Sequence, residues 1–432
     1  MTPVTTDATL RDRLMEDGYM LPTYRDHSIA NIPETIASVL GVDADRPLPD
    51  ETLPPKVTDG ETPIDHVVMV VIDGFGWDRF MALVEQDPTL SVLAEHATIT
   101  PLVSTYPSET ASAMITLYTG LQPVEHGQLG WFSLFKPDDI IALSLPFSTR
   151  DGRPLDEAYG YDHTALFDHD PHETITGRLQ RAGVEVSYVQ PELIANSPTS
   201  RYVAGEATRI GFETVDEGFD TVRSRLDQDD GPTYQQLYYP RVDAAGHREG
   251  TRSMAYREAL TAVLRPLEQQ LLRGLDEEVA QRTLVLVVAD HGQLDTAPDT
   301  NINIGQLEAD DRLNLDAHLR RRPDGTRMYL AGSPRNVQFY TKDGHSELLC
   351  DELEAALPVR TFTRSEYIDA ALFGDREPGQ FFTARAPDVV AVPRDRGLWY
   401  DDGELDLIGM HGGLHPREML VPFIALTPED IR

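Results

Sequence analysis

The chain has 432 residues, of which 37 are lysine or arginine and 72 are aspartate or glutamate, and its formal net charge is -35 at pH 7. A surface this acidic repels nucleic acids and anionic membranes, so we expect neither as a partner. No apolar run is long enough to span a membrane, and the first residues lack the basic and then apolar pattern of a signal peptide. We therefore expect a soluble, cytoplasmic protein.

The basic residues are almost all arginine, since lysine occurs only at positions 56, 136 and 342. An acidic, lysine-poor composition is typical of proteins kept soluble in very high salt, so we expect a halophilic protein, with an ordinary acidic protein as the alternative. The single cysteine, Cys350, excludes an intrachain disulfide framework and a thiolate metal cluster, and its helical surroundings predict a structural residue. A chain of this length can form one large α/β domain with an insertion, or two domains.

Residues 1–62 predict an N-terminal extension, in which helical patterns over 9–16 and 33–40 precede a linker rich in proline and aspartate. The first strand follows at 66–72. It is apolar without alternation, as a strand buried on both faces is, and it ends at Asp73. An acid at the carboxyl end of a central strand lies where α/β sheets bind ligands.

The next informative stretch is 104–120, in which small residues begin abruptly after a proline and a hydroxyl-rich turn. The pattern predicts a helix with Thr110 in its first turn. Free backbone N–H groups at such a helix start can hold a phosphoryl group beside the threonine hydroxyl. The aromatic loop 128–132 follows at a short distance, and we expect it near the same site.

Helical patterns and short strands alternate over residues 150–235, for example a helix at 174–182 and a strand at 184–189. This alternation predicts a doubly wound, mostly parallel sheet flanked by helices. The run 168–173 contains acids and histidines and resembles a metal site. An aspartate followed by proline and further acids is more typical of a helix start, which is the interpretation we prefer.

Three later motifs place acids and imidazoles at strand ends in the same way. The apolar strand 284–289 ends at Asp290 and His291, and residues 237–240 lead into Asp243 and His247. His411 lies on a glycine-rich loop before the apolar run 419–424. Because strand ends of a parallel sheet meet at one edge, we expect these side chains to converge with Asp73 and Thr110.

Composition changes over residues 318–385, where strands are predicted near 327–330 and 337–340 and helices near 347–357 and 367–373. We interpret 318–385 as an inserted α+β cap that sets substrate choice. The predicted core then has two parts, 63–317 and 386–432.

The converging side chains suit phosphate ester hydrolysis. That reaction needs a nucleophile, neutralisation of charge on the phosphoryl oxygens and a stabilised leaving oxygen, and two divalent ions about 4 Å apart supply all three. A metal ion beside the threonine hydroxyl would lower its pKa and replace a general base. Mixed aspartate and histidine ligands favour zinc, with manganese as the alternative, over magnesium or calcium.

Together these motifs resemble the alkaline phosphatase superfamily and, within it, the type I phosphodiesterase/nucleotide pyrophosphatase-like branch. The resemblance extends over roughly residues 66–425 and implies an alkaline phosphatase-like fold with two metal ions and a covalent phosphothreonine. It implies that one ion is held by Asp73, Thr110, Asp290 and His291. The other ion would be held by Asp243, His247 and His411.

Two threonines compete for the nucleophile position. Thr110 has the family's distance to the pair Thr119 and Gly120 that closes the helix, whereas Thr105 lies five residues earlier. Thr105 is followed by Tyr-Pro-Ser, which superficially resembles the Phe-Pro-Asn that follows the nucleophile in the family. We take the spacing as decisive and assign Thr110.

One position departs from the family pattern. Nucleotide-cleaving members have an asparagine that helps hold a phosphoryl oxygen, and Trp131 occupies that place here. Trp131 and Trp77 are our candidates for substrate contacts, by stacking on a base, with packing at the rim as the alternative.

The function we expect is a metal-dependent phosphodiesterase or nucleotide pyrophosphatase acting on a small-molecule phosphate ester, of the nucleotide diester type. A phosphomonoesterase or phosphomutase of the same superfamily is one alternative. It would need a basic pocket, for which Arg241 and Arg248 are the nearest cations in sequence to the motif at Asp243. A non-catalytic metal-binding scaffold is the other alternative, which the intact ligand set disfavours.

Overall fold

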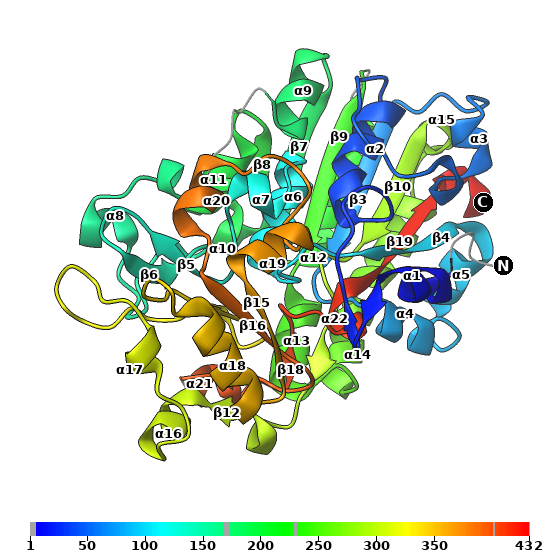
Figure 1. Cartoon of the computed structure of the whole chain (residues 1–432). Helices are drawn as coiled ribbons and strands as arrows, with labels where there is room; N and C mark the ends of the chain where they lie inside the picture. Colours follow the sequence, from blue (N-terminus) through cyan, green and yellow to red (C-terminus); the bar gives the residue numbers. More distant parts are fainter. Residues whose placement is uncertain (1–5, 168–172, 229–230, 401, 432) are drawn as a thin grey trace.

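The computed structural model describes residues 6–167, 173–228, 231–400 and 402–431. Two β-sheets, each with its own apolar core, form the framework, with helices flanking the larger one (Figure 1). The predicted run 168–173 falls almost entirely outside the described residues. Among the described residues, no helix combines the length and apolar character needed to cross a bilayer.

The main sheet has seven strands, and five of them are parallel. Their order is β4 (Thr98–Val103), β19 (Leu420–Leu426), β10 (Thr283–Val288), β3 (His66–Ile72), β9 (Thr233–Tyr239), β7 (Glu185–Pro191) and β8 (Thr208–Phe212). The last strand of the chain, β19, lies between β4 and β10 and runs antiparallel to both. This sheet confirms the predicted α/β class with a mostly parallel centre.

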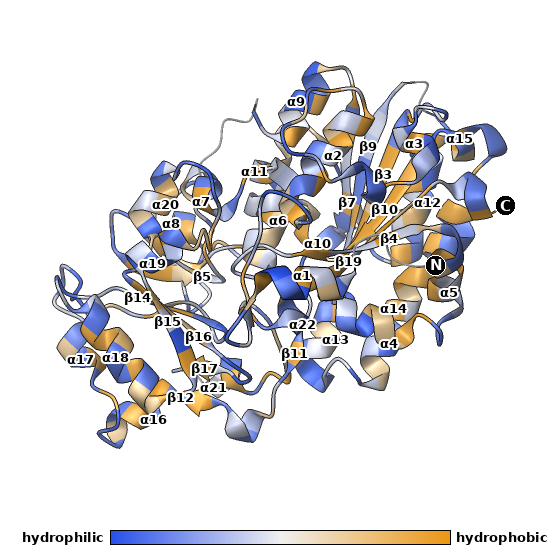
Figure 2. Ribbon diagram, turned by 45° about the vertical axis from the view of Figure 1, so that its right-hand side comes forward, coloured by the Kyte–Doolittle hydropathy of each residue, from blue (hydrophilic) through white to orange (hydrophobic). Residues whose placement is uncertain are grey.

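The apolar runs of the sequence explain the centre of this sheet. Every residue of β3, β9 and β10 is buried, because helices cover both faces and no strand there needs a polar side. In Figure 2 strands β3 and β10 are mainly coloured as hydrophobic, whereas blue segments lie on the helices around them.

The second sheet has six strands, and all of its pairs are antiparallel. Their order is β15 (Val359–Thr363), β16 (Val389–Pro393), β14 (Asn336–Phe339), β13 (Ala331–Ser333), β5 (Phe132–Phe135) and β6 (Ile140–Leu143). Its core includes Phe132 stacked on the buried Trp399. This sheet therefore takes strands from outside the predicted insertion 318–385, because β5, β6 and β16 complete it.

Two predicted elements in this region are displaced. The strand expected near 327–330 is found at Ala331–Ser333, and the helix expected over 367–373 spans Arg364–Asp369. This helix begins early because Thr363 and Glu366 form a capping box, and it ends early because Ala371 has a positive φ of 49°. Cys350 is half-buried on the helix predicted for it, and burial raises the pKa of its thiol.

The helices that connect these strands are short, and those expected at 9–16, 33–40, 174–182 and 347–357 are present within two residues of the predicted bounds. They are α1 (Asp7–Leu14), α2 (Ile32–Val39), α3 (Pro55–Thr58), α4 (Trp77–Leu83), α5 (Pro88–His96), α6 (Thr110–Thr119), α7 (Pro123–His126), α8 (Leu155–Tyr159), α9 (Ile175–Arg181), α10 (Glu192–Ala195), α11 (Pro198–Ala204), α12 (Val215–Leu226), α13 (Arg241–Glu249), α14 (Met254–Pro266), α15 (Glu277–Gln281), α16 (Ile304–Ala309), α17 (Leu315–His318), α18 (Ser346–Ala356), α19 (Arg364–Asp369), α20 (Gln380–Arg385), α21 (Asp402–Leu405) and α22 (Pro416–Met419). Three pairs of two-residue strands complete the fold: β1 (Met15–Glu16) with β2 (Tyr19–Met20), β11 (Leu294–Asp295) with β18 (Gly409–Met410), and β12 (Ile302–Asn303) with β17 (Leu398–Trp399).

Candidate active site

Thr110 is the first residue of α6, as the sequence predicts. Glu109 before it is extended, and its carbonyl oxygen accepts the N–H groups of Ser112 and Ala113. No side chain caps this helix, so its first N–H groups face the site. The Thr110 hydroxyl oxygen lies 3.1 Å from Nε2 of His291. Thr105, by contrast, is completely buried, and its hydroxyl donates to the carbonyl oxygen of Pro107 at 3.2 Å.

Asp73 and Asp290 follow the adjacent parallel strands β3 and β10, so their carboxylates meet at the sheet edge. His291 Nε2 lies 3.4 Å from Asp73 Oδ1 and 3.3 Å from Asp290 Oδ2. All three side chains are at most 3 % exposed. The turn after Asp73 needs Gly74, which has φ of 73° and on which a Cβ would approach the Asp243 Cα to 2.9 Å.

Asp243 and His247 are four residues apart on α13 and therefore share one face of the helix. Asp243 Oδ2 lies 3.2 Å from His247 Nε2, and Asp243 Oδ1 lies 3.5 Å from His411 Nε2. The two imidazole Nε2 atoms are 3.2 Å apart. These side chains are 13 % to 23 % exposed, so this half of the cluster opens toward solvent while the half at Asp290 is closed.

All three histidines present the same nitrogen to the cluster. Each Nδ1 donates to a backbone carbonyl: His247 to Gly409 at 2.7 Å, His291 to Gly292 at 3.0 Å and His411 to Ser108 at 3.3 Å. Since Nδ1 carries a proton in these bonds, Nε2 is the nitrogen that faces the carboxylates and that can bind a metal ion once it is deprotonated. This is the orientation of a metal-ligating histidine fixed by a backbone partner.

The metal-free cluster carries strongly perturbed pKa values. Burial, together with Asp290 and Asp243, raises the pKa of Asp73 well above its usual range, and burial likewise raises the pKa of Asp290. Burial alone would lower the pKa of His247, but the Asp243 carboxylate raises it to about 9. Burial and the neighbouring His291 ring hold the pKa of His411 well below its usual range. Packing three acids so closely without a cation is unfavourable, and bound divalent ions would remove that cost.

A second, independent observation indicates that these aspartates and histidines suit divalent metal ions. Asp73 Oδ1 and Asp290 Oδ2 are buried oxygens without a hydrogen-bond partner. Buried acceptors are normally paired, so these two oxygens are suited to binding a cation. Ligand atoms of Asp73, Asp290 and His291 lie within 4.8 Å of one another, as do those of Asp243, His291 and His411.

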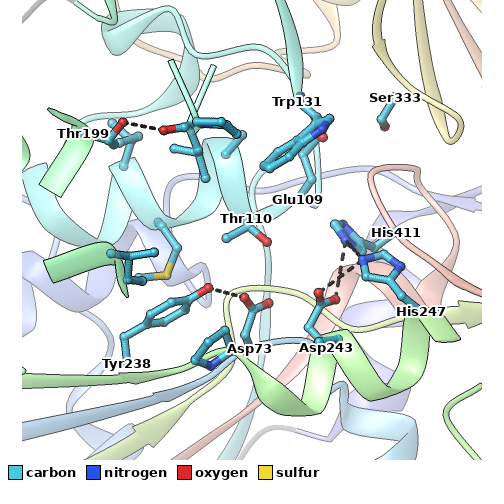
Figure 3. A pocket seen from close by; sticks show the side chains of 18 of the residues that line it. Asp73, Glu109, Thr110, Trp131, Thr199, Tyr238, Asp243, His247, Ser333 and His411 are labelled. Atoms are coloured by element: carbon cyan, nitrogen blue, oxygen red, sulfur yellow. Dashed lines mark hydrogen bonds and ion pairs between the residues drawn. The ribbon is translucent and has the colours of Figure 1, made fainter. Parts of the chain in front are cut away.

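A cavity of about 660 Å³ opens at this cluster, and Asp73, Thr110, Asp243, His247 and His411 line it. In Figure 3 Thr110 lies in the middle, with Asp243, His247 and His411 on one side and Tyr238 and Thr199 on the other. A volume of this size suits a small molecule.

The fold agrees with comparisons to known proteins. Residues 67–414 match the family described as Type I phosphodiesterase / nucleotide pyrophosphatase. The chain belongs to this family. The match confirms the predicted family and includes every candidate residue from Asp73 to His411.

Individual proteins and solved structures are also similar to this chain. Ectonucleotide pyrophosphatase/phosphodiesterase 1 of Saccharomyces cerevisiae is 26 % identical over 244 residues, which are 51 % of this chain and 32 % of that protein, so the aligned part spans about a third of its length. Murine ectonucleotide pyrophosphatase/phosphodiesterase 5 in complex with AMP has a TM-score of 0.60 at 17 % identity, covering 84 % of this chain and 88 % of that one. Phosphonoacetate hydrolase from Sinorhizobium meliloti 1021 has a TM-score of 0.56 at 18 % identity, covering 86 % and 95 %. At these identities the two structures establish the fold.

Several side chains of this phosphodiesterase-family member donate hydrogen bonds to the acids of the site, and the sequence analysis did not predict them. The Tyr238 hydroxyl donates to Asp73 Oδ2, and the Gln293 amide donates to Asp243 Oδ1 and, at 3.1 Å, to its carbonyl oxygen. The Ser104 hydroxyl donates to the carbonyl oxygen of Asp290 at 2.5 Å. Each lies within a few residues of a recognised motif, and that proximity is the only sequence signal for them.

The structure corrects the expectation for Trp77. Its side chain is 3 % exposed and packs against Phe80 with ring centroids 5.3 Å apart, and it does not line the cavity. The first turn of α4 faces the main core, so the indole is buried there. Trp131 does line the cavity, and its backbone N–H donates to Glu109 Oε2 at 3.0 Å.

Three polar residues near the recognised motifs do not line the cavity. His415, close after His411 in the sequence, is half-buried and caps α22 by accepting the N–H of Arg417 at 3.1 Å. Arg241 and Arg248 are exposed on α13, and neither lines the cavity.

Proposed function

We propose that this member of the phosphodiesterase family is a two-metal phosphodiesterase with Thr110 as its covalent nucleophile. The observation that carries the proposal is the position of Thr110. This residue opens helix α6 and lines the cavity, and its hydroxyl oxygen lies 3.1 Å from His291 Nε2. Phosphoester hydrolysis is the chemistry that the family and its structural relatives support.

The ligands fall into two sets, as the family resemblance implies. Asp73, Thr110, Asp290 and His291 would hold one divalent ion. Asp243, His247 and His411 would hold the other. When bound, such ions neutralise phosphoryl charge and lower the pKa of a neighbouring hydroxyl. We propose zinc, with manganese as the alternative, because three imidazoles contribute ligands.

The chain's own groups supply the rest of the reaction. The Thr110 oxygen forms a bond to phosphorus while the bond to the leaving ester oxygen breaks, which yields a phosphothreonine and an alcohol. Water then attacks that phosphorus and releases Thr110. The N–H groups that open α6 face the phosphoryl oxygens in both steps, and Tyr238 orients Asp73.

Two observations favour a diester over a monoester or a mutase substrate. A terminal phosphate carries a second charge, and none of the described lining residues is lysine or arginine. The murine relative bears the name of a pyrophosphatase/phosphodiesterase, and its inactive variant replaces a threonine by alanine and is in complex with AMP. We extend to this chain both the nucleophilic threonine and a small nucleotide-type ester as substrate.

The nucleophile is tested by three variants assayed in molar salt with zinc or manganese, on a nitrophenyl nucleotide diester and a nitrophenyl monoester. Thr110→Ala should abolish turnover, whereas Thr110→Ser should retain part of it because the hydroxyl survives. Thr105→Ala is the matched control and should change turnover little. A dead Thr105→Ala with a nearly normal Thr110→Ala would move the nucleophile to the preceding turn. A wild-type enzyme that cleaves only the monoester would favour the phosphomonoesterase alternative, and one that cleaves neither would favour the scaffold.

A further inference from the structure

A segment that precedes the family match contacts two loops of the candidate site. The match begins at residue 67, and we call residues 19–31, which lie well before it, the strap. Most of the strap is buried, with Met20 and Ile29 fully enclosed and Tyr24 only 3 % exposed. Its apolar side chains belong to the main hydrophobic core. The strap is therefore an internal part of the molecule.

Polar side chains of the strap fix its own path. Ser28 and Asn31 form a capping box around the 3₁₀ turn Ile29–Asn31. The Asn31 amide also donates to the carbonyl oxygens of Tyr24 and Arg46, at 3.4 and 2.9 Å. These bonds hold the segment in one conformation, so that the groups it offers to neighbouring loops have fixed positions.

Tyr24 bonds the turn that leads to the proposed nucleophile. Its hydroxyl oxygen accepts the backbone N–H of Tyr106 at 3.0 Å, and the same hydroxyl donates to the carbonyl oxygen of Leu372 at 2.8 Å. Tyr106 is completely buried and lies four residues before Thr110. Leu372 follows α19, which packs on β15 of the second sheet. One side chain thus links the turn before Thr110 to the side of the second sheet.

Other parts of the strap reach the same site from different directions. The backbone N–H of Met20 donates to the carbonyl oxygen of Leu414 at 2.7 Å, three residues after His411. The carbonyl oxygen of His27 accepts the N–H of Val103 at 2.8 Å, at the end of β4 and directly before the turn. The 3₁₀ turn of the strap packs against α6. The strap therefore contacts the loop of one proposed metal ligand and both sides of the proposed nucleophile.

Tyr106 is held from both ends. Its backbone N–H donates to the strap, and its hydroxyl donates to Asn336 Oδ1 of the second sheet at 2.8 Å. Without the Tyr24 hydroxyl, two buried backbone groups would lose a partner, which is unfavourable and favours a local rearrangement. Reacting atoms must be held about 3–3.5 Å apart, and a misplacement of about 1 Å can lower the rate about 100-fold. A small shift of this turn would therefore affect the chemistry at Thr110.

We propose that the strap is part of the catalytic unit and that Tyr24 is a positioning residue, which acts on Thr110 through the turn at Tyr106. The strap itself performs no chemical step. This inference rests on the proposed function, because it gives Tyr24 a role in presenting the proposed nucleophile.

The first test removes one hydroxyl from the strap. Tyr24→Phe keeps the ring in the core but takes away the acceptor of the Tyr106 N–H. Zinc-loaded protein is assayed in molar salt with p-nitrophenyl thymidine 5′-phosphate. The kcat should fall about tenfold while KM stays within about twofold, because the groups that bind the substrate are unchanged. Metal content, measured by elemental analysis, should equal that of the wild type.

Tyr340→Phe is the matched control. Tyr340 is likewise buried and does not line the cavity, and its hydroxyl donates to the carbonyl oxygen of Arg385 at 2.8 Å. This variant should also lower the urea midpoint, but its kcat should equal that of the wild type. An equal fall of kcat in both variants would reduce Tyr24 to a structural residue and overturn the proposal. An unchanged kcat in Tyr24→Phe would overturn it as well.

Hydrogen exchange separates this inference from the proposed function, because it needs no substrate. Peptides that include residues 104–109 should exchange at least about fivefold faster in Tyr24→Phe than in wild-type protein, and at the wild-type rate in Tyr340→Phe. If wild-type protein cleaves the diester but neither kcat nor exchange changes in Tyr24→Phe, only the strap's role is wrong. If no diester is cleaved while exchange over 104–109 still rises, the proposed catalysis fails and the hold of the strap on the turn stands.

Discussion

Loops and helices around the main sheet carry Thr110 and all six aspartates and histidines proposed as metal ligands, whereas the second sheet carries none of them. The second sheet contacts the site through Ser333 of β13, which lines the cavity, and through two consecutive residues, Arg335 and Asn336, at the start of β14. The fully buried Arg335 bonds both carboxylate oxygens of Glu418, at 2.9 and 2.7 Å. Glu418 in turn accepts the backbone N–H of Gly413 at 3.0 Å and so fixes the loop that carries His411.

Asn336 makes the corresponding connection to the nucleophile. Its amide donates to Glu109 Oε1 at 3.3 Å, and its oxygen accepts the Tyr106 hydroxyl at 2.8 Å. Glu109 immediately precedes Thr110, and its other oxygen accepts the N–H of Trp131. The groups proposed for the chemistry therefore lie on the side of the main sheet, whereas residues of both sheets hold them in position. The second sheet therefore acts as a fixed brace as well as a wall of the cavity.

Metal removal should have the largest effect on turnover, because it takes away the ions that all the proposed ligands on the main-sheet side would hold. Chelation should lower turnover at least about 1000-fold, and zinc or manganese should restore it. Elemental analysis should give two ions per chain. Asp290→Asn should reduce the metal content at the closed half, whereas Asp243→Asn should reduce it at the open half. No more than one ion per chain in saturated wild-type protein would contradict the two-metal assignment.

Breaking the buried ion pair of the brace should have the next largest effect. Arg335→Met leaves Glu418 charged and unpaired in the interior, and we expect a loss of about 3–5 kcal/mol in the free energy of unfolding. Urea denaturation measures it. Arg223→Met is the matched control, because Arg223 pairs with Asp220 at the exposed surface and its loss should cost less than about 1 kcal/mol. Similar losses in both variants would show that the brace has no special role.

A smaller effect is expected for Asn336→Ala. The change leaves Glu109 and the Tyr106 hydroxyl without one partner each, which should cost about 1–3 kcal/mol of stability. Because the contact fixes the residue before the nucleophile, kcat should fall while metal content stays at the wild-type value. A normal kcat with reduced stability would confine Asn336 to a structural role.

Salt should have the smallest effect at any single residue, because it acts on charges over the whole surface. With a net charge of -35 the folded chain repels itself, and salt screens that repulsion. The melting temperature should rise between low and molar KCl. A melting temperature independent of KCl would count against a halophilic protein.

Asp73, Asp290 and Thr110 could be predicted from the sequence because they follow a strongly apolar strand or open a helix. Asp73 and Asp290 end runs that could only be buried strands, and Thr110 begins its helix where small residues replace a hydroxyl-rich turn. Their roles as ligands and nucleophile remain predictions. The α/β class followed from the same runs and is confirmed.

The second sheet was less predictable because its pairing is non-local. Strand β5 pairs with β6 nearby and, through Phe132, with Gly332 of β13 far along the chain, and nothing in its four residues indicates that distant partner. Asn336 and Arg335 resemble ordinary polar residues before a strand, and only tertiary structure reveals what they bond. Of the two tryptophans proposed as substrate contacts, Trp77 does not line the cavity, because the sequence does not show that the first turn of α4 faces the main core.

The position of β19 has a consequence for biosynthesis. Residues 420–426 fill the gap between β4 and β10, so a ribosome-bound chain that lacks them has two strands with unpaired edges facing each other. Domains fold as units during synthesis, and open strand edges favour aggregation. The nascent protein therefore completes its main sheet, and brings the His411 loop beside Thr110, only after residues 420–426 have left the ribosome.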